Sequence, residues 1–195
     1  MNNYRTKRLV YVAVLCAIEL VFQFVGNFVG LGPISLNLSL IPITFGAIVF
    51  GPWGGALLGL INGVVVLLSP NTWALFMPNL LTALGTVLLC LTKCTIAGFV
   101  GGLLNKIISH KSKVSGHLTA SIVIPIINTA IFAAAALVLY RTLLVENSKL
   151  YANIYAYLFL GFLGWNFIFE LLTTIVFTPI LVHVFAKYVP EKNLE

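Results

Sequence analysis

The chain has no aspartate, and its five acidic residues are all glutamates. Charged residues make up only 8% of the 195 residues, against about 25% in a typical soluble domain. The three histidines and three cysteines are not spaced as ligands of one metal ion. No P-loop and no nucleophile elbow is present. These shortages exclude a soluble domain and disfavour an enzyme with an acid/base or metal centre.

Hydrophobic residues are abundant instead, at 60% of the chain, with a mean hydropathy of +1.06. This composition predicts an all-α integral membrane protein with one compact domain over residues 1–195. Gly51-Pro52 predicts a tight turn between the second and third of six spanning helices, and the sixth is long enough to tilt or protrude. The six predicted spans are residues 8–28, 34–50, 53–69, 80–105, 117–140 and 156–187.

The basic residues predict the orientation of these spans. Arg141 and Lys149 fall on one side of the membrane, and eight others fall on the opposite side. Because Lys and Arg collect in cytoplasmic loops, both termini are predicted to be cytoplasmic. The eight are Arg5, Lys7, Arg8, Lys106, Lys111, Lys113, Lys187 and Lys192.

Three connections would then face outward, at residues 26–33, 69–78 and 141–155. In the middle one, two prolines bracket a turn that contains Trp73 and Phe76, which suits a lid over a cavity. Anchoring of these aromatic side chains at the membrane interface is the alternative.

The first helix has two different faces. Glu19, Gln23 and Asn27 recur every four residues and share one face, which should point inward because polar side chains are expensive in lipid. Ala13 and Ala17 form a small-residue pair on the nearly opposite face. That pair predicts docking of a helix from another protein, with internal close packing as the alternative.

Polar residues also follow inward stripes on the last three helices. Together they predict a small-molecule pocket that opens outward, although a single buried asparagine more often joins helices. The predicted substrate-binding residues are Lys93, Asn128, Asn166, Glu170, Asn79, Trp73, Gln23, Asn27 and Trp165.

Lys93 lies in the middle of an apolar run, LLCLTKCTIAG. Its ammonium group suits an anionic ligand, but an internal ion pair with Glu170 or Glu19 is an open alternative. Cys16, Cys90 and Cys94 are interpreted as small packing residues.

Four motifs occur in order along nearly the whole chain: Ala13-x-x-x-Ala17, Gly51-Pro-Trp-Gly-Gly-Ala-x-x-Gly59, Asn128-Thr129 and Asn166-Phe-Ile-Phe-Glu170. In this arrangement the chain resembles the substrate-binding S component of energy-coupling factor (ECF) vitamin transporters. The resemblance implies a non-enzymatic, six-helix subunit of the bacterial cell membrane that captures a vitamin from outside and topples in the bilayer to deliver it. It implies a transmembrane coupling protein that contacts the Ala13/Ala17 face, and two cytoplasmic ATPases that use ATP. No cofactor is expected in this chain.

The Asn128-Thr129 and Asn166-x-x-x-Glu170 pairs look most like the pantothenate-type branch of the family. An ammonium at Lys93 would suit the carboxylate of pantothenate, and Asn79, Asn128 and Asn166 would suit its amide and hydroxyls. Folate and biotin are also anionic, and cobalamin would need a wider mouth. Thiamin, a cation, fits Glu170 but not Lys93.

Two other classes of protein remain as alternatives. A membrane-embedded enzyme acting on lipid or prenyl substrates is disfavoured by the absence of aspartate and of any acid/base or metal cluster. A structural membrane protein is disfavoured by the clustered inward polar residues.

Overall fold

The computed structural model describes residues 3–28, 36–76, 79–150 and 153–186. Every regular element in these ranges is a helix, which agrees with the predicted all-α class. The helices are α1 (Asn3–Phe28), α2 (Leu40–Val49), α3 (Gly51–Leu67), α4 (Pro70–Phe76), α5 (Leu80–Ser109), α6 (Lys113–Leu139), α7 (Arg141–Asn147), the 3₁₀ turn η1 (Ser148–Leu150), α8 (Ile154–Ala156), the π-helical turn η2 (Tyr157–Phe162) and α9 (Gly164–Ala186).

Three helical stretches of the described chain are long and apolar enough to cross a membrane: α5, α6 and the run Ile154–Phe185. Apolar helices of intermediate length lie at Val10–Gly26, Leu40–Val49 and Gly51–Leu67. α2, with 10 residues, rises only about 15 Å, roughly half of the hydrocarbon thickness. The count of six spans therefore stays a prediction.

The join between α2 and α3 is as tight as Gly51-Pro52 predicts, because only Phe50 separates the two helices. Gly51 has φ +74°, a left-handed conformation that glycine adopts without strain. Pro52 follows in the first turn of α3, where a missing N–H costs nothing. The chain thus reverses within one residue and places α3 beside α2.

α3 packs directly on the backbone of α5 along a row of glycines spaced four apart. Gly55 faces Gly98, Gly59 faces the carbonyl of Cys94, and Gly63 faces the carbonyl of Cys90. Small residues at such spacing let two membrane helices approach closely. α5, and the polar residues that it carries, is thereby fixed against α3.

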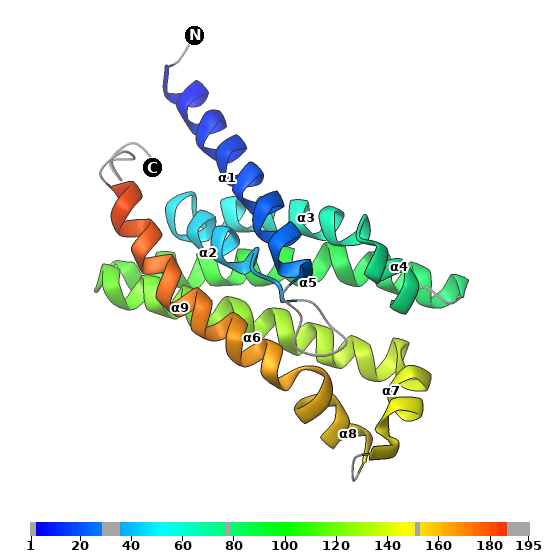
Figure 1. Cartoon of the computed structure of the whole chain (residues 1–195). Helices are drawn as coiled ribbons and strands as arrows, with labels where there is room; N and C mark the ends of the chain where they lie inside the picture. The colour runs from blue at the N-terminus through cyan, green and yellow to red at the C-terminus, as the bar shows by residue number, and fades with distance from the viewer. Residues whose placement is uncertain (1–2, 29–35, 77–78, 151–152, 187–195) are drawn as a thin grey trace.

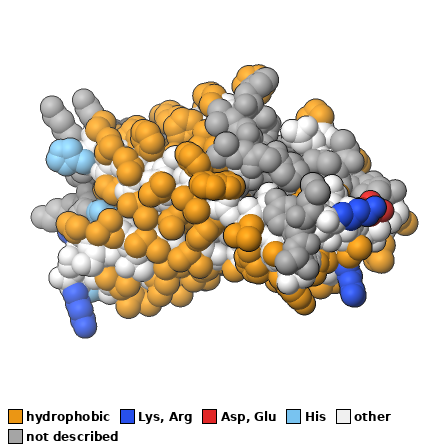
Figure 2. All heavy atoms as spheres, turned by 60° about the horizontal axis from the view of Figure 1, so that its bottom comes forward, with side chains coloured by type: hydrophobic (Ala, Val, Ile, Leu, Met, Phe, Trp, Pro, Cys, Tyr) orange, Lys and Arg blue, Asp and Glu red, His pale blue; other side chains and the backbone are white. Residues whose placement is uncertain are grey.

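The outer surface is apolar, as a lipid-facing surface must be. Figure 2 shows hydrophobic side chains covering the middle of the molecule, with Lys and Arg side chains at its two ends. Many large apolar side chains of α3, α5, α6 and α9 are exposed, among them Leu84 and Val138 at 62% and 79%. This distribution is the reverse of a soluble bundle and matches a membrane-embedded one.

The start of α1, the α5–α6 link and the end of α9 lie at one end of the molecule, and the short helices α4 and α7 lie at the other (Figure 1). Lys106, Lys111 and Lys113 are exposed at the α5–α6 link. Lys187 and Lys192 lie outside the described residues. The arrangement is compatible with the predicted basic side, and its assignment to the cytoplasm stays a prediction.

Among the described residues, the core contains two apolar clusters with polar residues between them. Along α6, Ile124 belongs to one cluster and Ala133 to the other, and Asn128 falls between. Along α5, Cys94 belongs to the first cluster and Leu89 to the second, with Lys93 between. The candidate site occupies this polar level of the bundle.

Candidate functional site

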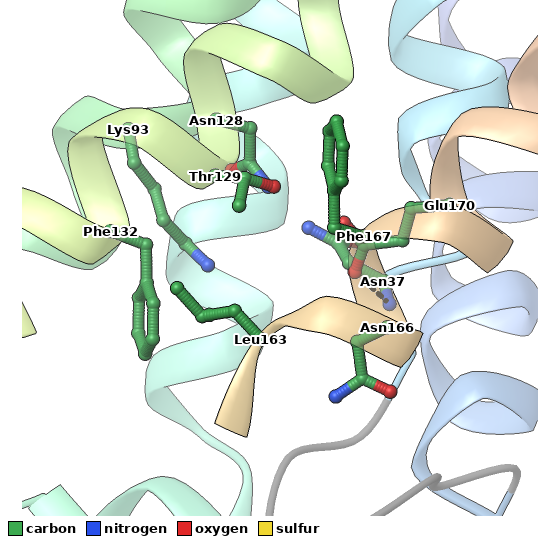
Figure 3. Close-up of a pocket in the computed structure, with 9 residues that line it drawn as sticks. All are labelled: Asn37, Lys93, Asn128, Thr129, Phe132, Leu163, Asn166, Phe167 and Glu170. Carbon is green, nitrogen blue, oxygen red and sulfur yellow. Dashed lines mark hydrogen bonds between the residues drawn. The ribbon is translucent and has the colours of Figure 1, made fainter. Parts of the chain in front are cut away.

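A pocket opens between α5, α6, α9 and the residues before α2 (Figure 3). Its volume is about 50 Å³. Its lining residues are Asn37, Lys93, Asn128, Thr129, Phe132, Leu163, Asn166, Phe167 and Glu170.

Helical spacing explains how two of these elements present their side chains. Asn166 and Phe167 each share a face of α9 with Glu170, because residues three and four positions apart lie on one side of a helix. Leu163 precedes them at the end of the π-helical turn, where its N–H donates to the carbonyl of Leu158 at 2.9 Å. The break between η2 and α9 therefore lies at the pocket wall.

The pocket is cationic on one side and carries a carboxyl group on the other. Lys93 and Phe132 lie together on one side, and Glu170 and Asn37 lie on the opposite side (Figure 3). The ammonium Nζ of Lys93 lies over the ring of Phe132, 5.2 Å from the ring centroid, a cation–π contact. The backbone N–H of Asn37 donates to Oε1 of Glu170 at 3.0 Å.

The structure shows no ion pair of Lys93 with Glu170 or Glu19 in the described part of the chain, the alternative left open by the sequence. Lys93 is instead held by the aromatic ring, with its ammonium group pointing into the space between the two walls (Figure 3). This leaves the ammonium available to an anionic group of a ligand.

Asn37 offers a second unused group to the pocket. Its Oδ1 is buried and has no hydrogen-bond partner among the described residues, and Asn37 is only 8% exposed. A buried carbonyl oxygen without a partner loses the hydrogen bonds that it makes in water, at roughly 1–3 kcal/mol. A donor group of a ligand would satisfy this oxygen.

Four of the predicted substrate-binding residues line this pocket: Lys93, Asn128, Asn166 and Glu170. They come from three helices that are distant in sequence, and the fold brings them together. Their role in ligand binding stays a prediction.

The other five predicted residues are not among the lining residues. Asn79 is the N-cap of α5, where its Oδ1 accepts from the backbone N–H of Thr82 at 3.1 Å. Trp73 on α4 and Trp165 on α9 are 59% and 63% exposed, positions that suit interfacial or lipid contact. Gln23 is buried elsewhere, and the side chain of Asn27 lies outside the described residues.

Gln23 belongs to a second polar cluster beneath α1. The hydroxyl Oγ of Ser39 lies 3.1 Å from Oε1 of Gln23 and 3.2 Å from the backbone carbonyl oxygen of Glu19. Glu19 is fully buried, and neither of its carboxyl oxygens has a hydrogen-bond partner in the described structure. Glu19 and Gln23 therefore point inward as predicted, but they face this cluster and not the pocket.

Ala13 and Ala17 are exposed on α1, on the face away from Glu19 and Gln23. Large apolar residues surround them on the same exposed surface, among them Val10 and Val14. This exposure agrees with the two predicted faces of the helix. Docking of a partner on this surface stays a prediction.

Sequence reasoning did not identify Asn37, Phe132, Leu163 or Phe167 as site residues. Asn37 gave no periodic signal, because it is a single asparagine in a non-helical segment just before α2. Phe132 did leave a signal, since it lies four residues after Asn128 and so extends the stripe on α6.

Cys94 is not the simple packing residue that the sequence suggested. It is fully buried, and its sulfur lies within hydrogen-bonding distance of three asparagine side chains. Among the described residues, no group of three or more His, Cys, Asp or Glu side chains is placed to hold a metal ion.

A family model described as "ECF transporter, substrate-specific component" matches residues 7–184. No curated protein and no solved structure matches the chain. The matched region includes every residue that lines the pocket and the exposed alanines of α1. The chain therefore belongs to the substrate-specific components of ECF transporters, membrane transport subunits that bind a substrate and work with an ECF transmembrane component and ATPases.

Proposed function

We propose that the pocket binds pantothenate, captured from outside the cell. One observation carries the proposal: Lys93 and Glu170 lie on opposite walls of one pocket and are not paired with each other. Such a site suits a ligand with an anionic group at one end and hydrogen-bond donors at the other. Pantothenate has this construction, with a carboxylate at one end and two hydroxyls at the other.

The remaining lining residues suit the middle of the same molecule. Asn128, Thr129 and Asn166 provide partners for an amide between the two ends. Phe132, Leu163 and Phe167 provide apolar contacts for methyl and methylene groups. In this arrangement the carboxylate lies at Lys93, and the hydroxyls lie at Glu170 and Asn37.

Charge alone does not separate pantothenate from folate or biotin, which are also anionic. Glu170 on the opposite wall favours a ligand end that donates hydrogen bonds, which pantothenate offers with its hydroxyls. Biotin and folate also carry N–H donors, so binding measurements decide among the three. Thiamin is disfavoured because its positive charge would approach Lys93. Cobalamin is by far the largest of these vitamins and would need a much wider mouth than the others.

Thermal unfolding of the purified protein against a panel of vitamins tests the proposal. A ligand present at 100 times its Kd stabilises the native state by about 2.7 kcal/mol. We expect pantothenate to raise the unfolding temperature and thiamin to leave it unchanged. Pantothenol, which carries an alcohol in place of the carboxylate, should have a much smaller effect. If folate, biotin or cobalamin raises the unfolding temperature more than pantothenate does, that vitamin becomes the assigned ligand. If no vitamin raises it, vitamin binding is refuted.

We further propose that the exposed Ala13/Ala17 face of α1 docks on the ECF transmembrane component, while the subunit topples in the bilayer with its pocket. Close approach of two membrane helices needs small side chains at the contact. The exposure of both alanines among large apolar residues supports this assignment.

Replacement of both alanines by phenylalanine is expected to reduce vitamin uptake by at least about tenfold, which corresponds to about 1.4 kcal/mol of docking energy. Vitamin binding by the isolated subunit should be unchanged. Ala134→Phe is the matched control, because Ala134 is an exposed alanine of α6. Uptake measured in cells with the complete transporter is the readout, and normal uptake by the double variant would contradict docking at this face.

A further inference from the structure

We propose that the thiol of Cys94 is a positioning residue of the pocket: it fixes which atoms of Asn37 and Asn128 are presented to the ligand. The inference rests on the proposed function, because it treats the pocket as the ligand site. Cys94 itself is not a lining residue and is 0% exposed.

Three asparagines from three different elements meet at the sulfur of Cys94. Nδ2 of Asn62 on α3 donates to Sγ at 3.1 Å, and Nδ2 of Asn37 donates at 3.7 Å. Sγ in turn donates to Oδ1 of Asn128 on α6 at 3.2 Å. A thiol has one proton to donate and a weakly accepting sulfur, so this arrangement uses its full capacity.

The thiol decides the orientation of both pocket amides. The two ends of an asparagine amide have the same shape but opposite hydrogen-bonding character. Because the sulfur receives Nδ2 of Asn37, the unpartnered Oδ1 of Asn37 is left for a donor group of the ligand. Because the S–H proton goes to Oδ1 of Asn128, the N–H groups of Asn128 are left for an acceptor group of the ligand.

The third asparagine, Asn62, hydrogen-bonds the sulfur of Cys94 but does not line the pocket. Asn62 is fully buried on α3, which approaches the backbone of α5 at Cys94 through Gly59. Its bond to Sγ leaves the thiol proton directed to Asn128 and not to α3. The pattern of one acceptor at Asn37 and one donor at Asn128 is therefore set by groups outside the pocket.

The consequence for the ligand is a requirement at two points. It must donate a hydrogen bond near Asn37 and accept one near Asn128. A hydroxyl beside Glu170 and an amide carbonyl in the middle of pantothenate meet both requirements. Loss of the thiol would leave both amides free to flip and would weaken this discrimination.

Two replacements of Cys94 test the role by isothermal titration of the purified protein with pantothenate, or with whichever vitamin stabilises the wild type. Cys94→Ala removes the sulfur, and we expect the affinity to fall by about tenfold, as for the loss of about 1.4 kcal/mol. Cys94→Ser keeps a donor and an acceptor at the same place and should restore most of the affinity. Cys90→Ala is the matched control, since Cys90 is a buried cysteine one turn away on α5 that does not line the pocket.

A readout without ligand keeps the inference testable if no vitamin binds. The S–H stretching band in the infrared reports hydrogen bonding of a thiol, and the band of Cys94 is the one lost in Cys94→Ser. We expect this band to move to higher frequency in Asn128→Leu, which removes the acceptor, and to stay unchanged in Cys90→Ala. A band that does not move in Asn128→Leu would overturn the proposed orientation.

The outcomes separate the two proposals. A wild type that binds no vitamin refutes the proposed function alone, and the infrared band then decides on the thiol. A wild type that binds, together with a Cys94→Ala variant of equal affinity, refutes the positioning role and leaves the proposed function intact. Where Cys94→Ala does not fold, Asn62→Leu is used in its place, because this change removes the hydrogen bond that Asn62 donates to the sulfur of Cys94. Unchanged affinity in Asn62→Leu would then refute the role.

Discussion

Lys93→Met is expected to weaken pantothenate binding by about 10- to 100-fold. A hydrogen bond to a charged group contributes roughly 1.5–3 kcal/mol, and every 1.4 kcal/mol is a factor of ten in Kd. The ammonium of Lys93 is already ordered over Phe132 and points into the pocket, so binding an anion costs little ordering of the side chain. Methionine keeps an unbranched, flexible side chain that is one heavy atom shorter, and it removes the charge and the donors.

Two controls isolate the interaction between the positive charge of Lys93 and the carboxylate of the ligand. Lys106→Met removes an exposed lysine from the same helix and should leave the affinity unchanged. Pantothenol should bind Lys93→Met and the wild type with nearly equal affinity, because it has no carboxylate to lose. Titration calorimetry gives all five affinities: pantothenate with the wild type and the two variants, and pantothenol with the wild type and Lys93→Met. A change below about threefold in pantothenate affinity, roughly 0.7 kcal/mol, would remove Lys93 from the ligand site.

Gly59→Val is expected to prevent stable folding. A Cβ atom at Gly59 would collide with the carbonyl group of Cys94 and with the N atom of Thr95 in the neighbouring helix. These are backbone atoms, so no side-chain rotation relieves the clash, and the two helices must separate. Overpacking of a core typically costs about 1–3 kcal/mol, and we expect the upper end of this range for Gly59→Ala and more for valine.

The unfolding temperature in detergent, together with the yield of monodisperse protein, measures the effect. Ala130→Val is the control, since Ala130 is an exposed alanine on α6 and has room for the same added methyl groups. A Gly59→Val variant that unfolds at the wild-type temperature would show that α3 and α5 are further apart than the structure places them. The change would also move α3 away from Cys94, so a partly folded variant should lose ligand affinity.

The sequence predicted the helical class and part of the site for one physical reason. Polar side chains inside apolar helices turn inward, and their spacing reveals which side of each helix that is. Lys93, Asn128, Asn166 and Glu170 were identified in this way, and all four line one pocket. The resemblance to ECF substrate-specific components is confirmed by the family match, whereas the pantothenate-type branch stays a prediction.

The spacing of polar residues shows which side of a helix they occupy. It does not show how deep in the bundle a residue lies or which residues of other helices it contacts. Gln23 points inward as predicted, yet the residues that it meets form a separate cluster with Ser39. Asn79 lies at the first position before a helix, where an asparagine caps the free N–H groups, and the sequence alone did not separate this role from ligand binding. Asn37 lies outside any helical pattern and reaches the pocket only through the tertiary fold.

The small volume of the pocket has a kinetic consequence. A cavity of about 50 Å³ is well below the roughly 300–1,000 Å³ of a typical ligand pocket, so the lining side chains must separate before a vitamin enters. When the competent state is only a fraction of the population, the apparent Kd equals the intrinsic Kd divided by that fraction. Association is then slower than the usual range of 10⁵–10⁷ M⁻¹s⁻¹, because binding waits for a conformational change. Release of the ligand requires the same separation of side chains, so we expect slow exchange in both directions.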